Sequence, residues 1–268
     1  MEPAPQEHPA TPGRLRRRPA RRTWVGNLGL VLVARVVASA FDTNCFVVAP
    51  AEGEDCVVVD PGIGVENGVD ELLRRHRLNP VAVLLTHGHI DHCFSVTPVC
   101  GAKNIPALIH PDDRAQLTDP WSGFGAPAGS PMFGRLTFSE PDDVRELRDG
   151  ETLQLAGLDF LVRATPGHTR GSVTFGAPDP TGPEAPRLFS GDLLFRGSIG
   201  RSDLPGGSFP QLMDSLARTV LPLPDETIVH CGHYDDTTVG TERATNPFLA
   251  ELTGGFTGGP GAPSGRGL

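Results

Sequence analysis

The sequence His87-Gly88-His89-Ile90-Asp91-His92 follows directly on the apolar run Val81–Thr86 and places three imidazoles and a carboxylate within six residues. Unpaired polar rings at the end of a strand cost desolvation energy and contribute little packing, so the cluster is hard to explain structurally. A bound metal removes that cost. The first two histidines, two residues apart in extended chain, project to one side, whereas the Asp-His pair turns toward a second centre as a helix begins.

Three further motifs repeat the arrangement of a strand, a glycine and a candidate ligand. They are Pro166-Gly167-His168-Thr169, Ser190-Gly191-Asp192 and Cys231-Gly232-His233. Loops at strand ends gather at one edge of a sheet, where a rigid scaffold holds functional side chains in place. We therefore expect these residues to meet the His87–His92 cluster.

The remaining sequence predicts strands in both halves of the chain. Strands are expected at Leu30–Val37, Cys45–Ala49, Cys56–Asp60, Val81–Thr86, Ile105–His110, in a hairpin over Gln154–Ala164, and at Val173–Phe175, Leu188–Ser190 and Thr227–Cys231. Helices are expected over Val69–Leu78, over Asp112–Leu117, and from a capping box formed by Ser208 and Gln211 to about Val220. Helices do not alternate regularly with strands, which favours two sheets with helices outside over a TIM barrel or a Rossmann sheet.

The two ends of the chain have a different composition. We predict a disordered Arg/Pro-rich tail over residues 1–27, a folded domain over 28–253, and a flexible Gly/Pro tail over 254–268. The basic, then apolar, N-terminal sequence also imitates a secretory signal, but Asn27 and Arg35 interrupt its apolar run. There is no uncharged apolar stretch of 18 residues, so we expect a cytoplasmic protein without a membrane partner.

Charge and cysteine content exclude other classes of protein. The chain has 23 basic and 32 acidic residues and a formal net charge of −9, which gives no basic surface for nucleic acid. Its five cysteines form an odd number without CxxC spacing, so neither a disulfide framework nor a Cys-rich zinc site is expected. We interpret Cys93 and Cys231, which lie near the ligand motifs, as small buried packing residues.

With these motifs the chain resembles the metallo-β-lactamase fold superfamily and, within it, the glyoxalase II-like hydrolases (hydroxyacylglutathione hydrolases). The matching ligand positions are His87, His89, Asp91, His92, His168, Asp192 and His233. Stretches that are also similar are Asn44-Cys45-Phe46, Val59-Asp60-Pro61-Gly62, the loop from Gly197 to Gly207, and Asn246-Pro247-Phe248. The chain ends about 20 residues beyond Phe248, so it is similar to the short bacterial type without the helical C-terminal domain.

The resemblance implies an α+β fold, an αββα sandwich in which two sheets pack face to face with helices outside. It implies a dinuclear site at the edge of the sandwich, with Asp91 and Asp192 as catalytic residues. One metal would take His87, His89 and His168, the other Asp91, His92 and His233, with Asp192 bridging the two. Nitrogen and carboxylate ligands without thiolate suit two divalent cations, with Zn expected and Fe or Mn as alternatives.

The implied activity is hydrolysis of a small-molecule thioester of the S-2-hydroxyacyl-thiol type by a metal-bound hydroxide, in a monomer or homodimer. The alternative is a mononuclear iron persulfide dioxygenase of the same superfamily, whose Gly-Arg-(Thr/Ser)-Asp loop is similar to Gly200-Arg201-Ser202-Asp203. That enzyme would hold one iron with His87, His168 and Asp192. A lactonase or β-lactamase, or a non-catalytic metal-binding protein, are further alternatives.

Other residues have two interpretations each. Asp60 is expected either to hydrogen-bond a ligand histidine or to cap a turn. Arg201 would anchor a substrate carboxylate or form an ion pair within its loop, and Tyr234 is a candidate substrate contact beside the last histidine. A long connection over 119–141 predicts a lid, in which the aromatic residues Trp121, Phe124 and Phe133 would form a pocket wall. The histidines interpreted as incidental are His8, His76, His110 and His230.

Overall fold

Alternate side chains along the central strands pack into two different hydrophobic cores of the computed structural model. In β2 (Asn44–Ala49), Cys45 and Val47 point into one core, whereas Phe46 and Val48 point into the other. Successive side chains of a strand face opposite ways, so a strand that is apolar throughout needs a covering layer on each face. The structure describes residues 31–127, 130, 137–177 and 185–254. The predicted tail over 1–27 with His8, Phe133, and the predicted tail beyond Gly254 lie outside this range.

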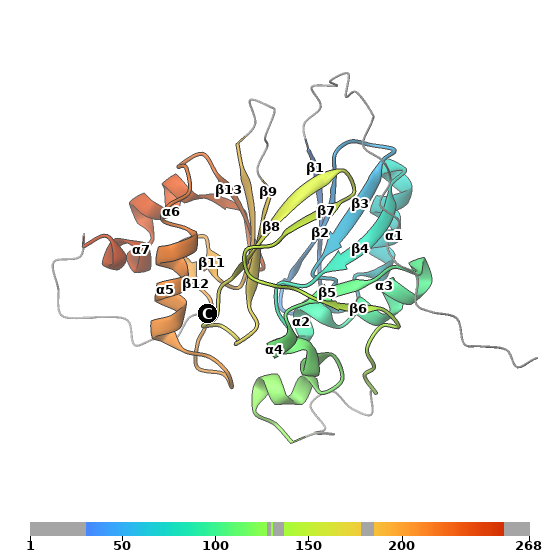
Figure 1. The fold of residues 1–268 in the computed structure, drawn as a ribbon, viewed down its shortest axis with the longest axis horizontal. Coiled ribbons are helices and arrows are strands. Elements are labelled where there is room, and N and C mark those ends of the chain that lie inside the picture. The colour runs from blue at the N-terminus through green and yellow to red at the C-terminus, as the bar shows by residue number, and fades with distance from the viewer. Residues whose placement is uncertain (1–30, 128–129, 131–136, 178–184, 255–268) are drawn as a thin grey trace, which may run out of the picture.

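Two six-stranded sheets supply these faces (Figure 1). The first has the order β1-β2-β3-β4-β5-β6, formed by β1 Leu32–Val37, β2, β3 Asp55–Val59, β4 Asn79–Leu84, β5 Ala107–Ile109 and β6 Val144–Glu146. The second has the order β14-β13-β10-β9-β8-β7, formed by β14 Thr237–Thr238, β13 Ile228–Cys231, β10 Arg187–Gly191, β9 Val173–Ala177, β8 Leu158–Ala164 and β7 Thr152–Leu155. A small hairpin joins β11 Leu194–Phe195 to β12 Ser198–Ile199.

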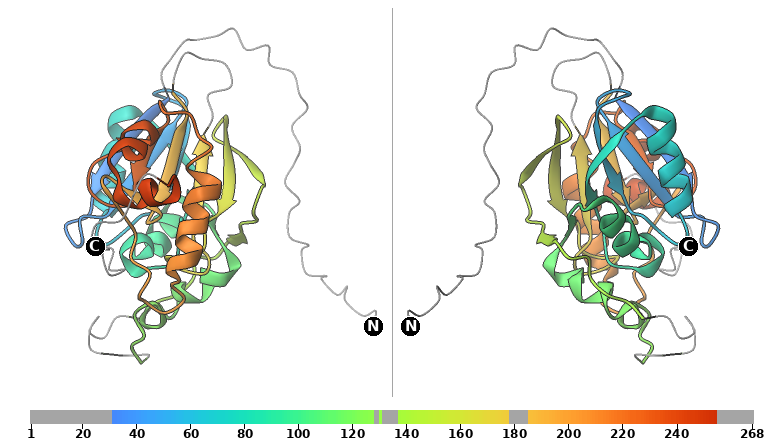
Figure 2. Two further views of the ribbon diagram at one scale, coloured as in Figure 1. Left: turned by 90° about the vertical axis from the view of Figure 1, so that its left-hand side faces the viewer. Right: turned by 90° about the vertical axis from the view of Figure 1, so that its right-hand side faces the viewer.

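Helices cover the outer face of each sheet, as the two side views show (Figure 2). Helices α1 (Glu66–His76) and α3 (Val96–Lys103) bury Val69 and Val99 in the outer core of the first sheet. The outer core of the second sheet is covered by α5 Phe209–Thr219, α6 Val239–Thr245 and α7 Pro247–Leu252. A third core lies between the sheets. Three cores between four layers confirm the predicted αββα sandwich.

The inter-sheet core is built around aromatic side chains of the second sheet. Phe160, Phe175 and Phe189 are all at most 1% exposed and pack against Val57 and Leu84 of the first sheet. All five cysteines are free and buried, and those near the ligand motifs belong to the outer cores, which confirms their interpretation as packing residues.

Local sequence patterns predicted most helices and strands, but several of the predicted boundaries are wrong. The first helix begins at Glu66 rather than Val69 and ends where Arg77 adopts a left-handed conformation at φ 53°. Ser208 does precede α5, but its side chain makes no capping hydrogen bond, so the predicted capping box is wrong. Its backbone N–H instead donates to the Gly167 carbonyl at 2.8 Å. The elements not predicted are α3, α6, α7, the 3₁₀ helix Pro120–Phe124 and the short strands β6, β11, β12 and β14.

The candidate ligands follow the carboxyl ends of strands from both sheets, and backbone contacts fasten these ends together. The Val173 N–H donates to the Thr86 carbonyl at 2.8 Å, and the Asn44 N–H to the Gly232 carbonyl at 2.7 Å. The Asn44 side chain donates to the Cys231 carbonyl at 2.9 Å. One edge of the sandwich is thereby closed by contacts between the sheets. Among the described helices, none combines the length and apolarity needed to span a membrane.

Candidate metal centre

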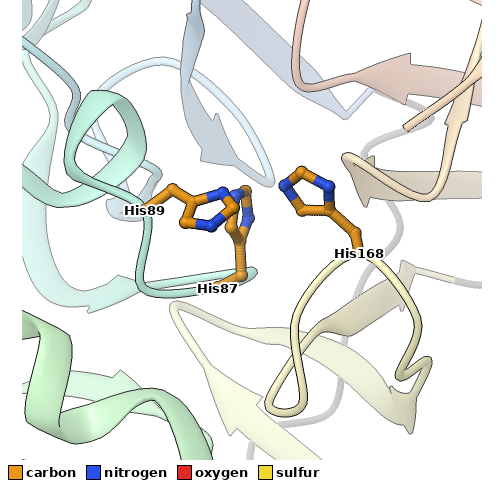
Figure 3. A group of neighbouring side chains, drawn as sticks. All are labelled: His87, His89 and His168. Carbon is orange, nitrogen blue, oxygen red and sulfur yellow. The ribbon is translucent and has the colours of Figure 1, made fainter. Parts of the chain in front are cut away.

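Three buried histidines from two loops form the first half-site. His87 and His89 lie in the loop between β4 and α2 (Ile90–Cys93), and His168 follows β8 in the second sheet. Figure 3 shows the three rings directed toward one another. Each is at most 4% exposed, and one nitrogen from each lies within 4.8 Å of the other two. This is the imidazole set expected for the first metal.

The second half-site is formed by the Asp-His end of the same loop and the last histidine. Asp91 Oδ2 lies 3.6 Å from His92 Nε2 and 3.3 Å from His233 Nε2. The two Nε2 atoms of His92 and His233 are 3.2 Å apart. Two ring nitrogens at this separation need a proton or a cation between them. The short helix α2 begins after His89 and brings Asp91 and His92 next to His233, while the His92 ring also lies beside the His87 ring, with centroids 4.1 Å apart.

Asp192, at the end of β10, lies between the half-sites. Its Oδ2 is 3.4 Å from His168 Nε2 and 3.5 Å from His233 Nε2, and its Oδ1 is 3.2 Å from His92 Nε2. Gly191 and Gly232 precede the ligands Asp192 and His233, and their backbones lie against the site. The structure thus brings all seven predicted ligands together.

The second ring nitrogen of four histidines is held by a hydrogen bond. His168 Nδ1 lies 2.7 Å from the Arg201 carbonyl and His233 Nδ1 lies 2.9 Å from the Phe41 carbonyl. A carbonyl can only accept, so each Nδ1 carries a proton and donates it, and each Nε2 faces the centre. This is the orientation of a metal-binding imidazole held by a partner outside the coordination sphere.

Asp60 holds the other two rings. Its Oδ2 lies 3.0 Å from His92 Nδ1 and accepts the Thr86 hydroxyl at 2.6 Å. Because that hydroxyl donates to Asp60, its oxygen accepts from His87 Nδ1 at 3.0 Å. Of its two interpretations, Asp60 therefore makes the hydrogen bond to a predicted ligand, and it reaches both half-sites. Thr86 was not predicted; its place at the end of β4 was the only sequence signal.

The atoms left without partners point to a cation. His87 Nε2, His89 Nε2, His168 Nε2 and Asp192 Oδ1 are buried and accept no hydrogen bond among the described residues. Buried polar groups are normally paired, and four unpaired acceptors in one place leave a desolvation cost that a divalent cation would remove. The donor set, nitrogen and carboxylate oxygen, suits Zn, Fe or Mn. The residues present therefore fit the implied metals.

Protonation differs between the half-sites of the metal-free protein. Burial, reinforced by neighbouring rings, lowers the pKa of His87 well below its ordinary value and that of His89 to about 3. Burial also opposes charge on His92 and His233, but Asp192 and Asp91 outweigh it. They raise the pKa of His92 well above its ordinary value and that of His233 to about 9. At neutral pH His87 and His89 are thus uncharged, whereas His92 and His233 are protonated.

Two aromatic residues near the site adopt a left-handed backbone conformation that their side chains disfavour. Phe41, at φ 64°, presents its carbonyl to His233, and Tyr234, at φ 63°, follows that ligand. The Tyr234 carbonyl accepts from the Asn44 side chain at 2.8 Å, and both aromatic side chains are more than half exposed. Such conformations cost about 1–3 kcal/mol each and persist where the surroundings enforce them.

The other residues around the site agree with the predictions only in part. Arg201 donates to Asp203 at 2.7 and 2.9 Å, which is the loop ion pair of its two interpretations. The Phe124 ring stacks on His89 with centroids 5.7 Å apart, whereas Trp121 is buried. The other three described histidines have partners elsewhere: Glu52 for His76, the Asp112 N–H for His110, and Asp236 for His230.

Comparison with known proteins agrees with this geometry. Residues 38–233 match the model of the metallo-beta-lactamase superfamily. An uncharacterized protein of Mycobacterium tuberculosis is 43% identical over 224 residues, which cover 83% of this chain and all of that protein. The hydroxyacylglutathione hydrolase GloC of Haemophilus influenzae is 30% identical over 222 residues, 80% of this chain and 96% of GloC.

Two solved structures are similar over most of the chain. The BLEG-1 B3 metallo-beta-lactamase superposes with a TM-score of 0.70 at 34% identity and covers 81% of this chain and 99% of its own. The di-iron-bound form of TTHA1623 superposes with a TM-score of 0.65 at 40% identity and covers 81% of this chain and all of its own.

Proposed function

This chain belongs to the metallo-beta-lactamase superfamily, and we propose that it is a dinuclear metal-dependent hydrolase of thioesters of the S-2-hydroxyacyl-thiol type. The observation that carries the proposal is the pair of complete half-sites joined by Asp192. The likeness to GloC, named as a hydroxyacylglutathione hydrolase, supports the substrate class.

Within this proposal the side chains divide as the geometry suggests. His87, His89 and His168 hold one cation; Asp91, His92 and His233 hold the other; Asp192 contacts both. When bound, the two cations supply an activated water at neutral pH and polarise the substrate carbonyl. Zn is our first candidate, and the di-iron form of TTHA1623 makes Fe the second.

The two carboxylates keep their charge throughout. Burial would raise the pKa of Asp91, but His92 and His233 lower it to about 2, and the same kind of neighbours hold the pKa of Asp192 well below its ordinary value. The Thr43 hydroxyl donates to Asp91 Oδ2 at 3.1 Å and fixes its orientation. We assign Asp91 the hydrogen bond to the attacking water and Asp192 the alignment of both half-sites.

A thioester fits this arrangement for two reasons. The thiolate leaves readily, so the reaction needs little help from a general acid. Two divalent cations opposite two ligand carboxylates also leave the site locally positive, so an anionic thiol carrier is compatible with the chain's net charge of −9. Tyr234, which follows the predicted ligand His233 and is about half exposed, is our candidate for contact with that carrier.

The test uses the full chain loaded with two equivalents of Zn or Fe and assayed with S-D-lactoylglutathione. We expect hydrolysis, and we expect Asp192→Asn to lower kcat/KM by more than the roughly 10–100-fold typical of residues outside the coordination sphere. Asp214→Asn, which alters an exposed ion pair on α5, is the matched control and should retain activity. Failure of the loaded enzyme to cleave this and other acyl thioesters contradicts the proposal.

The likeness to BLEG-1 favours hydrolysis of a β-lactam as a second candidate, since the same two half-sites would act on an amide. A chromogenic cephalosporin in the same assay distinguishes the two substrates. The mononuclear persulfide dioxygenase is the weaker alternative, because one iron on His87, His168 and Asp192 leaves the complete second half-site without a role. Oxygen consumption with glutathione persulfide would identify it.

A further inference from the structure

A buried carboxylate outside the predicted site connects the two loops of the first half-site. Asp113 lies in the short helix α4 (Pro111–Arg114), just after β5, and is 1% exposed. Its Oδ2 accepts the Gly88 N–H at 2.9 Å and the Thr169 hydroxyl at 2.7 Å, and its Oδ1 accepts the Gly171 N–H at 2.9 Å. Gly88 separates His87 from His89, and Thr169 follows His168.

The backbones of both loops lie directly against this side chain. A Cβ at Gly171 would lie 2.7 Å from Asp113 Cγ, and a Cβ at Gly88 would lie 2.7 Å from the Asp113 carbonyl oxygen. The contacts leave little freedom for either loop to move relative to Asp113. Because β5 pairs with β4, the strand that leads into the ligand loop, Asp113 is fixed to the first sheet while it holds a loop of the second.

The first half-site needs such a connection more than the second does. Asp60 reaches the rings of His92 and His87, but in the described parts of the chain no hydrogen bond reaches the His89 ring. The ring of His89 is oriented by stacking on Phe124 and by its own backbone. Asp113 accepts a hydrogen bond from the N–H of Gly88, the residue that precedes His89.

The charge of the first half-site is a second reason to expect such a connection there. The second half-site contains the carboxylate of Asp91, whereas the first contains three imidazoles and shares only Asp192. The partners of Asp113 among the described residues are two peptide N–H groups and a hydroxyl, without a cation. Its buried negative charge lies next to the loops that would carry a divalent cation, and it would partly offset that charge.

We propose that Asp113 is a positioning residue for the first half-site, setting the separation of His87 and His89 from His168 and strengthening metal binding there selectively. The inference rests on the metal-binding part of the proposed function. It does not depend on which substrate is cleaved.

The experiment measures Zn affinity of the metal-stripped full chain by competition with a chelating indicator. His233→Ala weakens Zn binding at the second half-site, so the titration then measures the affinity of the first. His89→Ala weakens Zn binding at the first half-site, so the titration then measures the affinity of the second. In the His233→Ala background we expect Asp113→Asn to weaken Zn binding about 10–100-fold. In the His89→Ala background we expect at most a small change. Asp112→Asn, an exposed neighbour in the same helix, is the matched control and should change neither affinity.

A merely structural role gives a different result. Asp113→Asn would then lower the melting temperature of the metal-free protein and weaken Zn binding equally in both backgrounds, or in neither. Either outcome overturns the proposal. If Asp113→Asn does not fold, Thr169→Val removes one of the three hydrogen-bond donors to Asp113. This variant should also weaken Zn binding selectively at the first half-site, but with a smaller loss of affinity. An unchanged Zn affinity of the first half-site in Thr169→Val also overturns the proposal.

The two proposals fail in different ways. A wild-type chain that binds two Zn ions but cleaves no thioester contradicts the proposed activity. The role of Asp113 in metal binding is then still decided by the Zn titrations described above. A wild-type chain that binds no Zn, Fe or Mn contradicts both.

Discussion

Individual histidines in this site differ in the charge they carry before a metal binds. His87 and His89 are held neutral by burial, whereas His92 and His233 are held protonated by Asp91 and Asp192. A metal must displace a proton only where one is present, so binding at the two half-sites should respond differently to pH.

We expect Zn affinity at the second half-site to rise with pH up to about 9, the raised pKa of His233. Below that pH His233 is protonated, and each proton displaced changes the affinity up to about tenfold per pH unit. Affinity at the first half-site should depend on pH less steeply, because burial lowers the pKa of His87 well below its ordinary value and that of His89 to about 3, so both rings are already neutral at pH 6. Zn titrations of the metal-stripped protein at pH 6, 7, 8 and 9 measure both steps.

The control for this prediction is His76→Ala, which removes a histidine remote from the site and should alter neither pH dependence. Equal pH dependence of the two binding steps would contradict the assignment of protons to the second half-site.

At the scale of elements, the ends of β10 and β13 show why a glycine precedes each ligand. A Cβ at Gly191, whose φ is 48°, would lie 2.4 Å from Thr86 Oγ1. A Cβ at Gly232 would lie 2.4 Å from Asp192 Oδ1 and 2.8 Å from His92 Cε1. The strands approach each other so closely at this edge that only a residue without a side chain fits between the ligands.

Gly232→Ala should therefore displace Asp192 and reduce both bound metal and activity. A misplacement of about 1 Å can cost roughly 100-fold in rate, and we expect a loss of kcat/KM of that order. Gly101→Ala on α3 is the matched control, because its Cβ would meet no atom within 4 Å and alanine favours a helix. Elemental analysis and kinetics of the two variants test the prediction. Full metal content in Gly232→Ala would count against it.

At the scale of the whole molecule, the metal centre joins the two sheets. His87, His89, Asp91 and His92 follow β4 of the first sheet, and the other three ligands follow strands of the second. Bound cations would add direct links to an interface that otherwise depends on the inter-sheet core and the backbone contacts near Thr86 and Asn44.

Removing the metals should thus lower the melting temperature. A ligand at 100 times its Kd stabilises the folded state by about 2.7 kcal/mol per site, and for a domain of this size each kcal/mol corresponds to about 2–4 °C. Thermal unfolding with and without a chelator should differ by about 5–10 °C per occupied site. Asp192→Ala, which lacks the shared ligand, should show a much smaller difference. An identical melting temperature for loaded and stripped wild-type protein would contradict this stabilisation.

The sequence by itself predicted the candidate ligands and the layered fold. His87, His89, Asp91 and His92 fall within six residues, and the resemblance to the metallo-β-lactamase fold predicted how two metals would share them. Apolar runs of strand length require cover on both faces. Boundaries such as Glu66 and the cap at Ser208 were less certain, because packing overrides local preference at the ends of helices.

Only the tertiary structure decided how the ligands are held. Asp60 reaches Thr86 across 26 residues of sequence, Asp113 reaches Thr169 across 56, and the Phe41 carbonyl reaches His233 across 192. These contacts arise where strands of two sheets end at the same edge, and no local pattern encodes which carbonyl or carboxylate will face a given ring. The candidate ligands could therefore be found as four short sequence motifs, whereas their precise placement depends on contacts that exist only after the two sheets have packed together.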